Sequence, residues 1–471
     1  MKYITYLFFC CLFLNACKND DDNNGKADDD RTEYQTWIED KMRAEYLWNI
    51  TSTPDYSKTG PEDFFISLLS DEDGKTRNNQ HYYYSYIEDA SAQSRGVLQE
   101  DYSYGFEFTG IYRDGTYTTM QALVLYVVEG SPAAQAGLRR GDWITEINGA
   151  PLTDSNYLSL LGAEACAFTI MRWDSKKGAP VTLADKIEIV SARRIEDHPV
   201  FMAKVLNSPQ KDKKVGYLLY NHFTDGKGDK DISYDDRLRS VSEEFQQAGV
   251  EEFVLDLRYN NGGLLSSALV LSAILAPEST FEKDFAYMQY RDQSKYTYRL
   301  DRQAHLKSNG KNLNLKTLYV LVSSTSASAS EMVINSLRPY MGQGNVILIG
   351  ERTEGKNVAS VSYTSSDERW IMHPIIGRIL NSKGESDYVD GFAPDHELDE
   401  VFIPVGTNTV RVIEVLPLGD PNERLLFAAL SLIDGTAVAS GNSRSSDGTA
   451  YRKAAVNSLD RRATNGVVVD L

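Results

Sequence analysis

Short apolar runs alternate with amphipathic segments through the middle of the chain. The runs at 215–220, 253–257, 318–322 and 346–349 are four to six residues long and predict buried strands. Between the first two runs, apolar side chains recur at helical spacing, at Leu238, Val241, Phe245 and Ala248. Strands that alternate with helices are typical of layered α/β folds. We therefore expect an α/β layer over about residues 194–417, followed by one more helix at 418–434.

The segment 32–95 has a different pattern, because its aromatic and aliphatic residues fall at helical intervals. They are Trp37, Ile38, Met42, Tyr46, Leu47 and Trp48, followed by Phe64, Phe65, Leu68 and Leu69. Such stripes are usually core positions. We interpret 32–95 as a small helical N-terminal domain. A role of this segment in packing over a functional cleft stays open, without support from the sequence.

Residues 96–193 combine strand and tight-turn signals. The apolar run 123–128 precedes a helix that Pro132 begins and Gly137 ends, and Asn148-Gly149 predicts a hairpin turn. This glycine pattern resembles a PDZ domain. The resemblance implies that Gly105 and Phe106 lie in a loop that binds a peptide carboxylate, while the peptide adds as a strand to the sheet edge. Taken alone, these two residues also fit an ordinary strand start.

The N-terminus has the pattern of an export signal. An apolar stretch too short to span a bilayer ends in Leu14-Asn15-Ala16-Cys17, which resembles a bacterial lipobox. We expect residues 1–17 to be a signal peptide and Cys17 to carry lipid, although an ordinary signal with a chance cysteine fits too. The acidic tract 18–31 predicts a disordered tether and resembles surface-export signals of Bacteroidetes lipoproteins. The expected location is the bacterial cell envelope.

Composition narrows the classes of function. The formal charge of −18 argues against a nucleic-acid partner, since phosphate binding needs a basic face. Three of the four cysteines lie at or before Cys17, so the mature fold has only Cys166 and no internal disulfide. The six histidines are scattered, so we expect neither a metal nor another cofactor.

A serine and a lysine carry the candidate chemistry. Three serines, Ser326, Ser328 and Ser330, follow the strand-like run 318–322, and Lys356 follows the run 346–349. A lysine desolvated in such a site can lose its charge and act as general base for a serine hydroxyl. All three serines suit a helix N-terminus, so the residues alone leave the choice among them open.

Residues 96 to about 417 resemble the carboxy-terminal processing proteases of peptidase family S41. The resemblance rests on the PDZ glycine pattern and on segments 215–217, 256–264, 326–331, 350–356 and 391–395. It implies three parts: the helical N-terminal unit, a PDZ-like β/α domain, and an α/β-layer core of the ClpP/crotonase type. By the same resemblance, Ser328 is the nucleophile and Lys356 the general base.

The family also implies the residues around this dyad. The N–H groups of Ala329 and of Gly262 or Gly263 would form the oxyanion hole. Glu331 and Thr353 match supporting positions, although a first-turn helix acid and a loop hydroxyl explain them equally well. Ser360 stands where many relatives place a glutamine that orients the lysine, and a serine is too short for the same contact.

The sequence therefore predicts a lipid-anchored serine endopeptidase that receives the C-terminal tails of proteins through its PDZ domain. The expected domains are 1–17, 18–31, 32–95, 96–193, 194–417, and a C-terminal helix with a flexible tail at 418–471. The alternative is a catalytically inactive, PDZ-based peptide-binding lipoprotein of the same fold, with Ser360 as the sign of a decayed site.

Overall fold

The computed structural model describes residues 31–51, 53–77, 80–90, 101–112, 118–162, 164–228, 230–406, 409–437, 451–462 and 467–468. The expected signal peptide, Cys17 and all of the expected tether except residue 31 lie outside these ranges. Among the described residues, no helix combines the length and the apolar character that crossing a membrane requires.

A six-stranded sheet forms the centre of the α/β core. Its order is β13-β14-β15-β18-β19-β24, with β13 antiparallel to β14 and the remaining neighbours parallel. The strands are β13 (Val200–Asn207), β14 (Lys214–Tyr220), β15 (Glu252–Asp256), β18 (Leu318–Val322), β19 (Val346–Gly350) and β24 (His396–Glu397). The four apolar runs of the sequence are β14, β15, β18 and β19, which confirms the predicted α/β layer.

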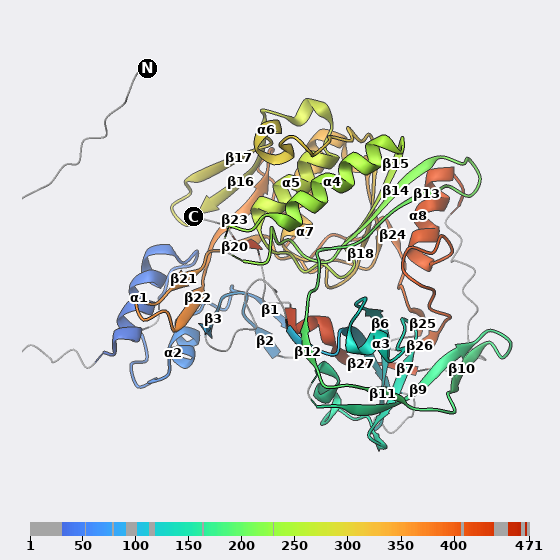
Figure 1. The fold of residues 1–471 in the computed structure, drawn as a ribbon. Helices are drawn as coiled ribbons and strands as arrows, with labels where there is room; N and C mark the ends of the chain where they lie inside the picture. The colour runs from blue at the N-terminus through green and yellow to red at the C-terminus, as the bar shows by residue number, and fades with distance from the viewer. Residues whose placement is uncertain are drawn as a thin grey trace, which may run out of the picture.

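Helices cover both faces of this sheet (Figure 1). Alternate residues of β18 divide between two cores: Val320 packs with helices α4 (Ser233–Gln247), α5 (Leu265–Leu275) and α7 (Ala329–Met341), and Leu321 packs with α8 (Arg424–Asp434). The side-chain period of two along a strand explains this division. Burial on both faces also explains why these strands are continuous apolar runs.

A second sheet lies on the other side of α7, which contacts both β19 and β23. Its order is β17-β16-β23-β20-β28, and β28 joins β20 in parallel. The strands are β16 (Asp284–Tyr290), β17 (Lys295–Arg299), β20 (Val358–Ser360), β23 (Ile375–Asn381) and β28 (Val467–Val468). The short helix α6 (Arg302–Leu306) packs on α5.

The N-terminal unit shares its hydrophobic core with the α/β domain. Helices α1 (Glu33–Glu45) and α2 (Pro61–Ser67) supply the apolar stripes that the sequence predicts, and these pack against Val358 and Met372. Strand β3 (Tyr86–Asp89) pairs with β22 (Trp370–His373), which in turn pairs with β21 (Tyr363–Thr364). Strands β1 (Lys75–Arg77) and β2 (Gln80–Tyr82) form a hairpin in the same unit.

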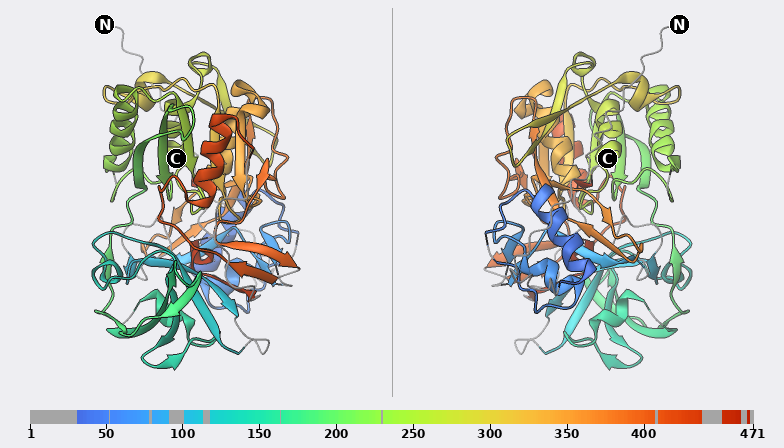
Figure 2. Two further views of the ribbon diagram at one scale, coloured as in Figure 1. Left: turned by 90° about the vertical axis from the view of Figure 1, so that its right-hand side faces the viewer. Right: turned by 90° about the vertical axis from the view of Figure 1, so that its left-hand side faces the viewer.

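The PDZ-like domain lies beside the core, in the lower half of the views in Figure 2. Ser131 caps the short helix α3 (Pro132–Gln135), and Asn148 and Gly149 both have positive φ at the turn after β7, as the sequence predicts. Cys166 is buried with a free thiol. The strands are β4 (Asp101–Ser103), β5 (Phe106–Tyr112), β6 (Met120–Val127), β7 (Trp143–Ile147), β8 (Ala150–Pro151), β9 (Cys166–Asp174), β10 (Ala179–Thr182), β11 (Ile187–Ile189) and β12 (Arg193–Ile195).

The C-terminal part of the chain returns to the PDZ sheet. Strands β25 (Phe402–Gly406), β26 (Thr409–Val412) and β27 (Tyr451–Asn457) extend it, and β27 runs antiparallel to β5. We expected a flexible tail here, and residues 402–412 within the catalytic core, so the structure differs at both places. Gly110 explains the packing, because a Cβ there would lie 3.2 Å from the Ala454 side chain. The strand was not predicted because it follows a Ser/Gly/Asp-rich stretch, a composition typical of loops.

Candidate active site

Ser328 occupies a strained turn between β18 and α7. Its φ of 60° and ψ of −111° lie outside the regions that non-glycine residues usually adopt, and its side chain is fully buried. The helix begins at the next residue, Ala329. Strain of this kind persists only where the surroundings hold it in place, and it is concentrated at functional sites.

The two neighbouring serines have structural partners. The hydroxyl of Ser326 donates to the carbonyl of Leu257 over 2.8 Å, and the hydroxyl of Ser330 donates to the carbonyl of Asn260 over 2.9 Å. Both bonds tie the serine turn to the segment that follows β15. Ser326 and Ser330 thus hold the turn in place, and Ser328 lies between them at the strained position before the helix.

Glu331 joins the serine to the loop that carries the lysine. Its Oε2 accepts the backbone N–H groups of Ser328 and Lys356, over 2.9 and 2.8 Å. Its Oε1 accepts the Thr353 hydroxyl and the Gly355 N–H, each over 2.6 Å. Burial raises the pKa of this carboxyl group, and the four hydrogen bonds oppose that rise. Glu331 and Thr353 are thus hydrogen-bonded to each other beside the serine turn.

Lys356 is buried behind the serine turn, with 1% of its surface exposed. Burial lowers its pKa from 10.5 to about 7, while the nearby charges of Asp73 and Glu331 oppose the change. An amine with such a pKa is partly neutral near pH 7 and can accept a proton. Asp73 comes from the N-terminal unit, whose apolar stripes in the sequence predict only core packing.

Two glycines form the opposite wall. A Cβ on Gly262, whose φ is 114°, would lie 2.8 Å from the Ser328 Cβ, so the backbone approaches the serine directly. The Gly262 N–H donates to Asn260 Oδ1 over 2.9 Å. The hydrogen bonds that hold the next turn run between Phe223 and residues 262 and 264, and leave the Gly263 N–H out. The Gly262 N–H is therefore engaged within its own loop, and the bonds to Phe223 do not use the Gly263 N–H.

A buried ionic cluster holds the segment that leads into the two glycines. The guanidinium of Arg258 is fully buried and donates to Asp256, Glu400 and Glu423 over 2.8 to 3.1 Å. These contacts join the strand end before Asn260 to the start of α8. A buried charge needs such partners to offset its desolvation. The sequence shows Arg258 within the glycine motif but gives no signal for its distant partners.

Ser360 lies in β20, where it is buried and pairs with Ile375 of β23 and with Val468 of β28. It is therefore close in the chain to Lys356 but belongs to a sheet strand. A different group approaches the lysine from outside its own loop, because the Lys356 Nζ lies 4.6 Å from the centroid of the Tyr84 ring.

The PDZ loop residues lie apart from the dyad. The side chain of Phe106 is buried in the PDZ core, and the Gly105 N–H donates to Ser103 Oγ over 2.8 Å. Strand β5 pairs with β6 along one edge and with β27 along the other. The edge at which a peptide strand would add is therefore paired with the chain's own C-terminal segment.

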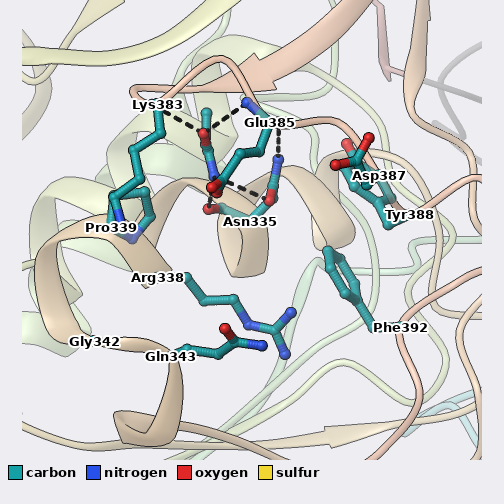
Figure 3. A pocket seen from close by; sticks show the side chains of 11 residues that line it. Asn335, Arg338, Pro339, Gly342, Gln343, Lys383, Glu385, Asp387, Tyr388 and Phe392 are labelled. Atoms are coloured by element: carbon teal, nitrogen blue, oxygen red, sulfur yellow. Dashed lines mark hydrogen bonds between the residues drawn. The ribbon is translucent and has the colours of Figure 1, made fainter.

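A pocket of about 300 Å³ lies at the far end of α7 and contains neither Ser328 nor Lys356 (Figure 3). The Arg338 guanidinium lies over the Phe392 ring, 4.5 Å from its centroid. The Phe392 N–H in turn donates to Thr353 Oγ1 over 2.8 Å. One wall of the pocket is thus hydrogen-bonded to the residue that supports Glu331, but the chemistry itself lies elsewhere.

Comparisons with known proteins agree with this geometry. Residues 214–398 match the model of peptidase family S41, and residues 123–163 match a PDZ domain. A solved structure from Bacteroides fragilis that is designated an S41 protease is 34% identical, with a TM-score of 0.71. The match covers 85% of this chain and 97% of the other.

Two curated relatives are more distant. A carboxyl-terminal-processing protease of Picosynechococcus is 28% identical over 50% of this chain and 50% of its own length. The carboxy-terminal processing protease CtpA of Bacillus subtilis is 24% identical over 66% of this chain and 59% of its own length. The chain thus spans only about half the length of these curated relatives. Fold, site and the near-complete match to the Bacteroides structure together show that this chain belongs to peptidase family S41.

Proposed function

We propose that the chain is a serine endopeptidase in which Ser328 is the nucleophile and Lys356 the general base. The single observation that carries the proposal is the joint anchoring of both residues on Glu331, with the lysine buried and its pKa near 7. A charged lysine could not accept the serine proton, and an unanchored one would not remain in reach of it.

The reaction follows from these positions. Lys356 Nζ takes the hydroxyl proton of Ser328 while Oγ bonds to the carbonyl carbon of the substrate, and the N–H groups of Ala329 and Gly263 stabilise the resulting oxyanion. The carbon–nitrogen bond then breaks, and the lysine returns its proton to the departing amine. Water, deprotonated by the same lysine, hydrolyses the acyl-enzyme and restores Ser328.

The test is cleavage of an unstructured protein, such as casein, by the purified chain. We expect turnover by the wild type and none by Ser328→Ala or Lys356→Ala, while Ser330→Ala stays active. Trapping of a radiolabelled acyl group on the serine peptide would identify the nucleophile. Turnover by folded Ser328→Ala would overturn the assignment, and binding of peptide without turnover by any variant would favour the inactive peptide-binding alternative.

We further propose that the PDZ domain receives the C-terminal tails of protein substrates along β5. Because β27 pairs with that edge, a substrate tail must displace it. Ser458, just after β27, accepts the Phe108 N–H over 2.8 Å and donates to Glu107. Replacing Ser458 by alanine should loosen this end and raise the affinity for a tail peptide. Unchanged affinity would place peptide docking elsewhere.

The proposed anchoring rests on the sequence alone. The lipobox ending at Cys17 supports lipidation, and the acidic tract behind it supports presentation in the cell envelope. Labelling of the expressed chain with a fatty-acid analogue should mark the wild type and not Cys17→Ser. Equal labelling of both would refute the anchor without affecting the protease proposal.

A further inference from the structure

The N-terminal unit reaches into the active site through the segment that joins β2 to β3. Tyr84 in this segment is 5% exposed, and its ring faces the Lys356 amine at 4.6 Å. Its hydroxyl donates to Glu354 Oε1 over 2.9 Å, two residues before the lysine. One side chain thus contacts both the reactive atom and the loop that carries it.

We propose that Tyr84 is the positioning residue for Lys356. This inference rests on the proposed role of Lys356 as general base. The Tyr84 ring approaches the amine from a separate element, the segment between β2 and β3. The N-terminal unit is then a part of the catalytic machinery.

The backbone of Tyr84 is itself fixed. Asp73 Oδ1 accepts the N–H groups of Tyr84 and Ser85 over 2.9 and 3.1 Å, and Asp73 Oδ2 accepts the Tyr46 hydroxyl over 2.8 Å. Tyr46 ends α1, so the position of the ring is set by the packed helices of the unit. The ring is therefore preorganised, as positioning of a catalytic group requires.

The loop of Lys356 is held on the same side by further bonds. The Tyr82 hydroxyl also donates to Glu354 Oε1, and the Lys75 amine donates to the Glu354 carbonyl. The Glu354 N–H donates to the Ser326 carbonyl over 3.0 Å, which links this loop to the nucleophile turn. Tyr82 shares the carboxylate with Tyr84 and supplies a matched control for loss of a single hydroxyl.

The ring has two effects on the lysine. It keeps water from Nζ, which favours the neutral amine, and its π face stabilises the ammonium ion that forms when the serine proton arrives. The charged groups around the amine are Asp73 from the N-terminal unit, Glu331 from α7 and Glu354 from the lysine's own loop. Without the ring, water reaches these charges and the amine, and the lysine stays protonated to higher pH.

The experiment compares Tyr84→Leu, Tyr84→Phe and Tyr82→Phe in the full chain. We measure kcat and KM against pH, and separately the pH dependence of Lys356 modification by trinitrobenzenesulfonate, followed by peptide mass spectrometry. Tyr84→Leu should lower kcat by about 100-fold with little change in KM, and shift the acid limb and the lysine titration upward by about one pH unit. Tyr84→Phe and Tyr82→Phe each lose one hydroxyl bond to Glu354 but keep the ring at the lysine, so both should leave the lysine titration in place.

A folded Tyr84→Leu protein with wild-type kcat and an unmoved lysine titration would overturn the inference, as would an equal loss in Tyr82→Phe. Should the leucine variant not fold, Tyr84→Met fills a similar volume without a π face and carries the same expectations. The titration is also measured in Ser328→Ala, where no turnover is needed. It therefore tests Tyr84 even if the protease assignment fails, and that assignment fails separately if Lys356→Ala is active.

Discussion

Ser328 and Lys356 donate their backbone N–H groups to the same oxygen atom, Oε2 of Glu331. The serine begins a helix and the lysine follows a strand, so nothing local in the sequence brings them together. The shared acceptor fixes the distance between the two backbones independently of the chemistry of their side chains. Glu331 is thereby the common anchor of the two backbone segments.

Replacing Glu331 by glutamine should lower kcat about 100-fold or more. A glutamine amide keeps one acceptor oxygen, but its NH₂ group faces at least one backbone N–H in either orientation and leaves it buried without a partner. We expect a lower melting temperature as well. Assays of kcat and thermal unfolding check this, with Glu397→Gln at an exposed strand position as the control. Wild-type kcat in Glu331→Gln would contradict the anchoring role.

The three serines should separate by their effects. Ser326→Ala and Ser330→Ala each lose a buried hydrogen bond and should cost about 1–3 kcal/mol of stability while turnover remains measurable. Ser328→Ala should remove turnover at little cost in stability. Chemical denaturation and casein cleavage on the same preparations test this. A stable but inactive Ser330→Ala variant would assign the nucleophile to Ser330 instead of Ser328.

Activity should fall as the pH drops through about 7. Lys356 must be neutral to accept a proton, and the structure places its pKa at about 7. Below that value, kcat/KM should fall tenfold per pH unit, and above it a plateau should appear. The profile for an uncharged peptide substrate measures this limb. A limb near pH 4 or near pH 10 would not fit a buried lysine base.

Lys356→Met should stabilise the protein below pH 7. The folded pKa is lowered from 10.5, so between about pH 7 and 10.5 the unfolded chain binds more protons and stability rises with pH. Below both values the buried charge opposes folding in full. The variant removes this cost, so its advantage of a few kcal/mol should shrink as the pH approaches 10. Unfolding curves at pH 6 and 10 test the sign.

Gly262→Ala should nearly abolish turnover, because the new Cβ would lie 2.8 Å from that of Ser328 at a φ of 114°. The serine turn would have to move, and with it the oxyanion donors. Gly228 is the matched control, since a Cβ there meets nothing within 4 Å. A loss of kcat in Gly262→Ala but not in Gly228→Ala would show that Gly262 must lie close to Ser328. Equal kcat in the two variants would show an ordinary turn.

Much of the fold could be predicted because strands buried on both faces leave continuous apolar runs. The apolar runs before Ser328 and Lys356 predicted strands β18 and β19 in this way. Glu331 and Thr353 entered as candidates through the motif resemblance, and the structure shows them hydrogen-bonded to each other. Asp73 and Tyr84 were not found, since an aromatic stripe in a helical unit signals only core packing. The choice between Gly262 and Gly263 needed the Asn260 contact, which a sequence does not contain.

In the proposed docking at β5, strand β27 competes with the substrate tail for the same sheet edge. It belongs to the same chain as β5, so its effective concentration at that edge is on the order of millimolar. A free peptide of micromolar affinity would therefore displace β27 from β5 only in a small fraction of the molecules. Only a substrate that also engages a second surface, such as the catalytic cleft, would gain enough avidity to displace it. Selectivity would then come from the length and reach of the substrate chain as much as from its last residues.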